Sequence, residues 1–146
     1  MLTLDRAGIA RLIPHAGAMC LLDGVVSWDA TKIRCVSRTH ADPGNPMRAG
    51  SQLDAVCGIE YAAQAMAVHG GLAGVAGVKP KAGYLASVRD VTWRAARLDD
   101  LPGELVVEAE RLMGDETRVI YGFVLWVGEM EVLSGRATVV LDVAAP

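Results

Sequence analysis

The sequence lacks the features that mark several large classes of protein. Nowhere in its 146 residues does an apolar run reach the roughly 18–20 uncharged residues of a membrane-spanning helix. The formal net charge of −3 leaves no basic excess, whereas a general nucleic-acid binder presents a basic face. No group of histidine, cysteine and aspartate residues has the spacing of a metal site. We therefore expect no membrane segment, no nucleic-acid partner and no bound metal.

Three further absences bear on bound cofactors and on the cellular location of the protein. No glycine-rich loop follows a predicted strand in the manner of a nucleotide-binding fold, so no cofactor is expected. The N-terminal residues MLTLDRAGIARLIP hold acids and bases but not the apolar region of a signal peptide. The three cysteines form no CxxC pair and lie in apolar settings, which is typical of reduced, buried thiols. These features predict a cytoplasmic protein.

What the sequence does contain is an excess of apolar residues, which make up 52% of the chain. A length of 146 residues suits one domain, 1–146, with a single core. Much of the excess lies in the stretch SQLDAVCGIEYAAQAMAVHGG, residues 51–71. Ser51 is a suitable helix cap and Gly70-Gly71 a usual stop. The stretch therefore predicts a helix that is apolar nearly all round and, for that reason, buried.

Beyond the first turn of this predicted helix the only acid is Glu60. A carboxylate in an apolar rod is costly unless it is paired or protonated. Pairing with Gln64, or with a residue of a partner chain, would give Glu60 a structural role. Its apolar surroundings would otherwise raise its pKa, so that it could donate a proton near neutral pH.

The remainder of the chain predicts strands around this helix. We expect a short helix from Thr3 to Ile13, a loop at His40–Gly50 and a glycine-rich crossing at Leu72–Ala82. The predicted strands, joined mainly by short turns, are Leu21–Trp28, Lys32–Arg38, Gly83–Arg97, Glu104–Met113, Thr117–Val127 and Glu131–Val143. Together they predict an α+β fold in which an antiparallel sheet wraps one long central helix. The first two strands would form a hairpin at Asp29-Ala30, and the strands after the helix a meander, with Thr117–Val127, apolar on both faces, at its centre. One subunit cannot enclose the helix completely, so a dimer is expected.

Three ordered motifs resemble the hot-dog fold and, within it, the 3-hydroxyacyl-acyl-carrier-protein dehydratases of fatty-acid and polyketide pathways. Ile13-Pro14-His15, with Leu21-Leu22-Asp23, is similar to the family's LPHxxPxLLxD opening. The run GIEYAAQ at residues 58–64 is similar to its central-helix E-x-x-A-Q. Leu101-Pro102-Gly103-Glu104-Leu105 is similar to its P-G-D-x-L turn.

The resemblance implies a dehydration by two side chains. A histidine base removes the C2 proton of the 3-hydroxyacyl thioester, and a carboxylic acid, here Glu60, protonates the departing hydroxyl. A backbone N–H at the helix start, near Ala55, would polarise the thioester carbonyl. The family's GHFPG histidine is absent, and its position falls on Pro46. His15 in the opening motif and His40 in the loop are the candidate bases. The alternative for His15 is a structural imidazole bonded to backbone, and the alternative for His40 is an exposed loop residue.

Sequences of one branch, including members of aryl-polyene pigment clusters, keep the IPH opening and the G-I-E-Y-x-A-Q helix without the GHFP histidine. The resemblance to that branch implies an acyl-carrier-protein or CoA thioester substrate and a homodimer or hot-dog heterodimer. Tyr84, with Trp93 and Met66, could line an acyl tunnel, and Arg89 could belong to a basic rim for the acidic carrier.

Two other functions remain open. One is an acyl thioesterase, with Glu60 or Asp54 orienting a water. The other is a non-catalytic acyl-binding subunit that completes a heterodimer.

Overall fold

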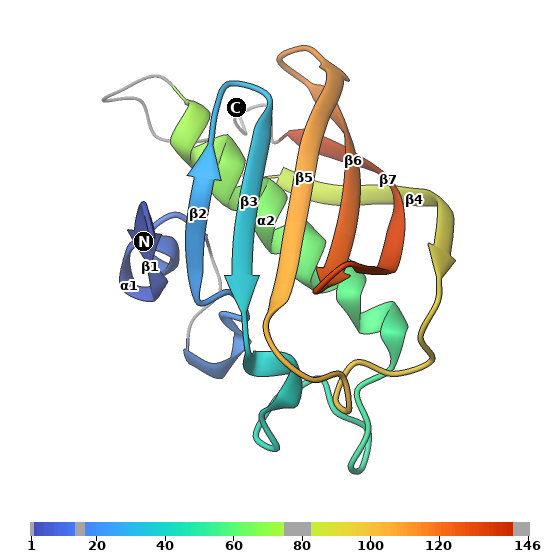
Figure 1. The fold of residues 1–146 in the computed structure, drawn as a ribbon. Coiled ribbons are helices and arrows are strands. Elements are labelled where there is room, and N and C mark those ends of the chain that lie inside the picture. Colours follow the sequence, from blue (N-terminus) through green and yellow to red (C-terminus); the bar gives the residue numbers. More distant parts are fainter. Residues whose placement is uncertain (1, 14–16, 75–82, 142–146) are drawn as a thin grey trace.

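The computed structural model describes residues 2–13, 17–74 and 83–141, so the candidate base His15 lies outside the described residues (Figure 1). The elements are β1 (Leu4–Asp5), α1 (Arg6–Ala10), η1 (Gly17–Met19), β2 (Gly24–Trp28), β3 (Lys32–Ser37), η2 (Thr39–Ala41), η3 (Ala55–Cys57), α2 (Gly58–Ala73), β4 (Gly83–Trp93), β5 (Leu105–Gly114), β6 (Arg118–Val127) and β7 (Met130–Leu141). Among the described residues, no helix is both long enough and apolar enough to cross a lipid bilayer.

The strands form one antiparallel sheet in the order β1-β2-β3-β5-β6-β7-β4. The long helix α2 crosses behind β3, β5 and β6 in the view of Figure 1 and contacts all three. This confirms the predicted antiparallel sheet around one long helix. It corrects the expectation of a simple meander after the helix, because β4 crosses to the far edge and pairs with β7, while β5 pairs with β3.

The two faces of the sheet differ in burial, as β6 shows. One set of side chains is buried on the inner face, toward α2, and consists of Val119, Tyr121, Phe123 and Leu125. The alternate set points to the outer face and includes Ile120, Val124 and Trp126, all half-buried. The prediction that β6 is apolar on both faces and lies inside the sheet is thus confirmed.

The edge strand β4 is long, open and irregular. It pairs with β7 only, so its other edge has no strand partner among the described residues. Its register shifts between Leu85 and Ser87 and again between Arg89 and Thr92. Within the second shift Asp90 adopts a positive φ of 56°, the left-handed conformation that aspartate tolerates better than most residues. The sequence's even alternation over this segment did not predict either bulge.

The start of α2 corrects the predicted helix boundary. Leu53 and Asp54 lie before the helix, and the segment is bonded to the residues after β4, through Leu98 N to Leu53 O (2.7 Å) and Ala55 N to Ala96 O (3.0 Å). Ser51 therefore caps nothing, and the helix begins with η3 instead. At the other end α2 passes through Gly70-Gly71 and stops at Ala73. Tertiary contacts set both ends, overriding the local signals.

The N-terminal region also differs from its prediction. Leu4 and Asp5 form a strand against β2, because the backbone here bonds to Val25 and Gly24 rather than to itself. The helix α1 that follows is only five residues long. Its cap is Asp5, whose Oδ1 accepts from Gly8 N at 2.9 Å, and not Thr3.

Two glycines of α2 offer a matched test of how closely the sheet approaches the helix. A Cβ at Gly58 would lie 2.6 Å from Leu133 Cδ2 and 2.9 Å from Leu125 Cδ2, both in fully buried residues. Gly58→Ala should therefore lower the free energy of unfolding by about 1–3 kcal/mol. Gly70→Ala, where a Cβ meets nothing within 4 Å, should raise it by about 0.5–1 kcal/mol. Guanidinium unfolding measures both, and equal shifts in one direction would contradict this packing.

Candidate functional site

Glu60 lies in the first turn of α2 and is half-buried. One helical turn further along, Gln64 is fully buried and donates from Nε2 to Glu60 Oε1 at 3.3 Å. The pairing of Glu60 with Gln64, one of the alternatives from the sequence, is present in the structure.

The Gln64 side chain also joins α2 to the segment between η1 and β2. Its Oε1 accepts from Leu21 N at 2.9 Å, and its Nε2 donates to Met19 O at 2.8 Å. Because an N–H can only donate and a carbonyl only accept, these two bonds fix the orientation of the amide. Gln64 therefore holds Glu60 beside residues 19–21. Gln64 is also a predicted substrate-binding residue. Its amide bonds to protein groups in this chain, and its assignment to substrate binding stays a prediction.

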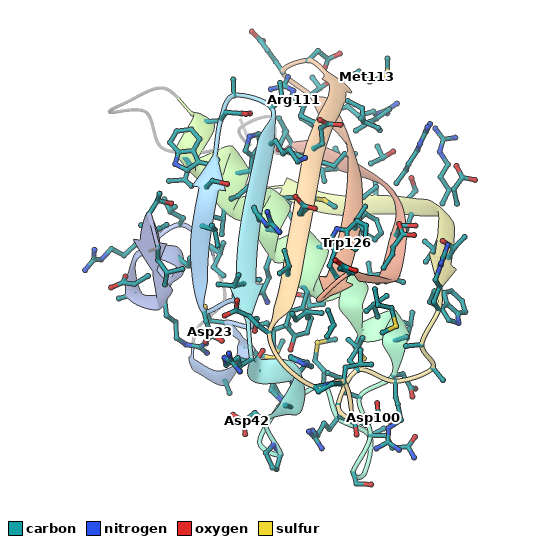
Figure 2. All side chains as sticks on the ribbon, viewed as in Figure 1. Asp23, Asp42, Asp100, Arg111, Met113 and Trp126 are labelled. Carbon is teal, nitrogen blue, oxygen red and sulfur yellow. The ribbon has the colours of Figure 1, made fainter. Side chains whose placement is uncertain are left out.

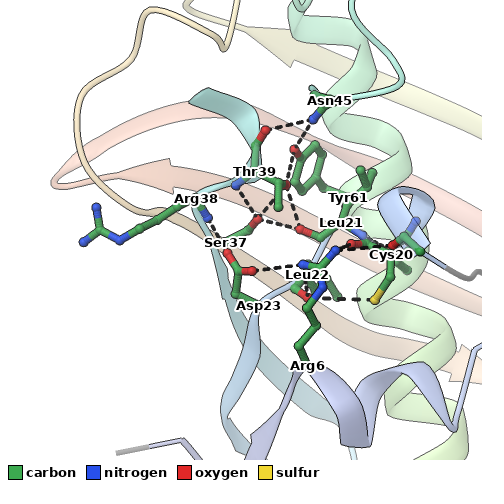
Figure 3. Close-up of polar contacts among 12 residues, drawn as sticks. Arg6, Cys20, Leu21, Leu22, Asp23, Ser37, Arg38, Thr39, Asn45 and Tyr61 are labelled. Carbon is green, nitrogen blue, oxygen red and sulfur yellow. Dashed lines mark hydrogen bonds and ion pairs between the residues drawn. The ribbon is translucent and has the colours of Figure 1, made fainter. Parts of the chain in front are cut away.

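A second polar connection ties the loop after β3 to α2 (Figure 3). Tyr61 OH bonds to Thr39 Oγ1 at 2.7 Å and accepts from Asn45 Nδ2 at 3.0 Å. Thr39 Oγ1 and Ser37 Oγ also both donate to Leu21 O. Sequence analysis did not identify this network. The signal that could have found it is the phenol of Tyr61, a polar group that must find partners on an otherwise buried helix.

Arg6 extends the same arrangement to the N-terminus. It forms an ion pair with Asp23 at 3.0 Å and donates to the carbonyls of Cys20 and Leu22, as Figure 3 shows. The other Asp23 oxygen accepts from Arg38 N at 2.7 Å. The segment that leads into β2 is thereby held from both sides, against α1 and against the loop that begins at Arg38.

His40 is buried, which corrects the interpretation of it as an exposed loop residue. Its Nε2 lies 3.2 Å from Leu101 O, so Nε2 carries the proton and Nδ1 keeps its lone pair. No hydrogen-bond partner of Nδ1 is present in the described part of the chain. Burial lowers the pKa of His40, and the nearby Arg38 and Arg48 lower it further. The side chain is therefore a neutral imidazole near pH 7.

His69, near the end of α2, has a structural role. Its Nε2 bonds to Asp29 O at 2.9 Å and its Nδ1 to Tyr121 OH at 2.7 Å, so both ring nitrogens have partners. These bonds join the helix to the β2–β3 turn and to β6. Burial raises the pKa of Tyr121 to about 12, so the phenol stays neutral as a donor to Nδ1.

The amide at the helix start that was expected to polarise a thioester is not that of Ala55. The Ala55 N–H already bonds to Ala96 O, and Cys57 N bonds to Asp54 O. Between them, Val56 N has no backbone partner among the described residues, and the Val56 side chain is 54% exposed. In this chain the amide available at the helix start is therefore that of Val56.

Two other predicted residues lie away from Glu60. Tyr84 pairs with Val140 and Arg89 with Arg136, positions whose side chains point to the outer face, whereas α2 lies on the inner face. The structure thus does not bring Tyr84 or Arg89 to Glu60 within one chain. Their assignment to a substrate site stays a prediction.

The inner side of the molecule is incompletely covered. Val56 on η3 and Ala67 on α2 are exposed on the same side as the half-buried Glu60. On β4, Leu85 and Trp93 pair with inner-face residues of β7 and are 41% and 56% exposed. Large exposed apolar side chains of this kind mark an interaction surface. Within the described ranges no group of three or more histidine, cysteine or acidic residues could hold a metal ion.

Comparison with known proteins gives one family match and several similar solved structures. A family model described as ApeP-like, ApeP dehydratase, matches residues 7–144. The dehydratase heterocomplex ApeI:P from Xenorhabdus doucetiae is similar with a TM-score of 0.77 and 18% identity, over 92% of this chain and 90% of that chain. A thioesterase from Haemophilus influenzae is similar with a TM-score of 0.65 and 13% identity, over 97% and 94% of the two chains. No curated protein matches the sequence. The structural similarities confirm the predicted hot-dog fold.

The Gln64 bridge predicts a large loss of stability on its removal. Gln64→Leu would leave the buried Leu21 N–H and the Met19 carbonyl without their partner, which should lower the free energy of unfolding by about 2–4 kcal/mol. Gln52→Leu, at an exposed position, should change it by less than about 0.5 kcal/mol. Urea unfolding of both variants tests this, and equal effects would show that the bridge contributes nothing.

The lowered pKa of His40 predicts a pH dependence of stability. Below the ordinary histidine pKa of 6.5 the unfolded chain binds a proton that the folded chain does not, so the free energy of unfolding falls as the pH falls. The slope should be at most about 1.4 kcal/mol per pH unit for this one group. His40→Gln, which keeps a donor for Leu101 O, should show a shallower slope from pH 7 to pH 5. Parallel curves for the two proteins would contradict the assignment.

Proposed function

The chain belongs to the ApeP-like dehydratase family, and we propose that it is a cytoplasmic subunit of an enzyme that dehydrates a 3-hydroxyacyl thioester on an acyl carrier protein. The product is the trans-2-enoyl thioester, and water leaves. The observation that carries this proposal is the carboxyl of Glu60, held by the buried Gln64 on the uncovered side of α2. A proton donor held at a fixed place and open to a ligand on one side is what the reaction needs.

The chemistry divides between a base and an acid. A base takes the C2 proton, the electrons of that C–H bond form the C2–C3 double bond, and the C3 hydroxyl departs. The protonated carboxyl of Glu60 gives its proton to that hydroxyl, which leaves as water. The base then holds the C2 proton and Glu60 is a carboxylate, so a proton exchange with solvent restores both groups. In this proposal the backbone amide of Val56, at the helix start, would polarise the thioester carbonyl.

His40 is a candidate for the base, as is His15. The Nδ1 atom of His40 retains its lone pair and its pKa is lowered by burial, so the imidazole is unprotonated at neutral pH. Its bond to Leu101 O keeps the proton on Nε2. A base needs this protonation state before it accepts the C2 proton. A histidine of a second subunit is the alternative, and the kinetic test below separates the two.

The site is completed by a second hot-dog subunit that pairs along β4. Support comes from the open edge of β4, from the uncovered Leu85 and Trp93, and from the exposed side of α2 beside Glu60. The similar ApeI:P protein is a dehydratase heterocomplex, so the partner is a second, different hot-dog chain or a second copy of this one. In either case Glu60 would lie close to the junction between the subunits.

The central test is the turnover of Glu60→Gln. With a 3-hydroxyacyl-acyl-carrier-protein substrate and the partner subunit present, this variant should lose at least about 100-fold in kcat, because general acid catalysis contributes about 10²–10⁴-fold. Its unfolding curve should stay close to wild type, since the amide is nearly isosteric. Glu129→Gln, in an exposed turn, is the matched control and should keep full activity.

The same assay separates the alternatives. Interconversion of hydroxyacyl and enoyl thioesters supports the dehydratase, while release of free thiol would identify a thioesterase. Unchanged turnover of Glu60→Gln in the active complex would leave this chain as a non-catalytic subunit. If His40 is the base, the rate falls at low pH as His40 takes up a proton, and His40→Gln should remove this acidic limb from the pH–rate profile. A profile that keeps this limb places the base on His15 or on the partner.

A further inference from the structure

The outer face of the sheet has an apolar strip that no described element covers. Ile120, Val124 and Trp126 follow one another along β6 on the side opposite α2. Figure 2 looks onto this face, with Trp126 near its middle and Met113 toward its upper end. The side chain of Met113 is 62% exposed and pairs with Ile120. A strand with water on one side ordinarily alternates apolar and polar residues, so this pattern indicates an interface.

Opposite charges flank the strip in one cross-strand row. Glu110 on β5 pairs with Gly122 on β6, and Gly122 pairs in turn with Arg136 on β7. Both charged side chains are exposed, and neither has an ion-pair partner in the described part of the chain. Between them lies a shallow hollow of about 420 Å³ above Gly122. Glu110, Gly122 and Arg136 thus lie side by side on three neighbouring strands across the outer face.

We propose that this outer face binds the outer face of a second copy of the chain, about a two-fold axis that runs along β6. Such an axis places β6 against β6 and β5 of one copy against β7 of the other. Glu110 then lies opposite Arg136 of the second copy, and Arg136 opposite its Glu110. Val124 and Ile120 meet their own counterparts near the axis. A two-fold interface must be complementary to itself in this way.

Charge complementarity selects this axis over the other possible one. A two-fold axis in the plane of contact but perpendicular to the strands would place β5 against β5. Glu110 would then face Glu110, with Glu108 of both copies on the same strand nearby, and like charges at an interface are unfavourable. The sheet curves around α2, so two outer faces touch mainly along a strip. The apolar residues occupy that strip, and long charged side chains flank it.

The interactions have different roles. Burial of Ile120, Val124 and Trp126 supplies the affinity, because apolar area removed from water is the main favourable contribution. The Glu110–Arg136 pairs at the rim fix the orientation and add little affinity. This association uses the face opposite α2, and so it does not depend on the subunit pairing along β4. Two β4-paired dimers could join through it into a tetramer.

A charge-swap experiment tests the proposal on the full chain. Molar mass by light scattering and sedimentation velocity would be compared for wild type, Glu110→Arg, Arg136→Glu and the double variant. Each single variant places like charges opposite each other and should halve the mass at a concentration where wild type is associated. The double variant restores opposite charges with their order exchanged and should regain the wild-type mass.

Three controls make the result decisive. Glu129→Arg and Arg11→Glu carry the same charge changes at exposed positions away from the face, and they should keep the wild-type mass. Val124→Asp, on the axis, should dissociate the assembly without any exchange of charge pairs. Circular dichroism and thermal unfolding verify that every variant is folded. The proposal is overturned if the single variants keep the wild-type mass, if the double variant does not regain it, or if Val124→Asp has no effect.

Discussion

The amide of Gln64 is the constraint on which the candidate site depends. It is buried on a helix whose neighbours are mostly alanine, so it must find hydrogen-bond partners inside the protein. Leu21 N, Met19 O and Glu60 Oε1 provide them. One side chain thereby fixes the segment before β2, orients a carboxylate and ties both to α2. The Tyr61 network does the same for the loop after β3, so the two loops beside Glu60 are anchored to one helix.

The second constraint is geometric. The seven-stranded sheet does not fully enclose the long helix. Apolar surface stays exposed at the edge strand β4, where Leu85 and Trp93 are uncovered. The half-buried Glu60 lies on the helix side that is also left open. Incomplete enclosure and partial access to the acid therefore have the same origin. In the proposed pairing along β4, a second subunit would complete the site and would also lower the exposed apolar area.

Much of the fold could be predicted from the sequence, because hydrophobic pattern and turn residues are local. The strands around Asp29-Ala30, the apolar helix and the two-sided β6 all follow from such signals. What could not be predicted depends on contacts between distant residues. Leu53 and Asp54 stay outside the helix because the segment bonds to residues 96–98, and the buried His40 bonds to Leu101 O. Among the site residues, the sequence identified Glu60 and Gln64 but not the bridge from Gln64 to Met19 and Leu21.

The position of β4 has a consequence for how the chain folds during synthesis. Its hydrogen bonds go to β7, whose residues 130–141 leave the ribosome last among the strands. The helix and the β2–β3 hairpin can form while translation continues, but residues 83–93 have no strand to pair with until β7 has been made. Pairings between distant residues are slow to form, and an unpaired strand can associate with other chains. Nascent molecules therefore keep an unpaired strand segment exposed until β7 is made, and chains truncated before β7 would keep it permanently.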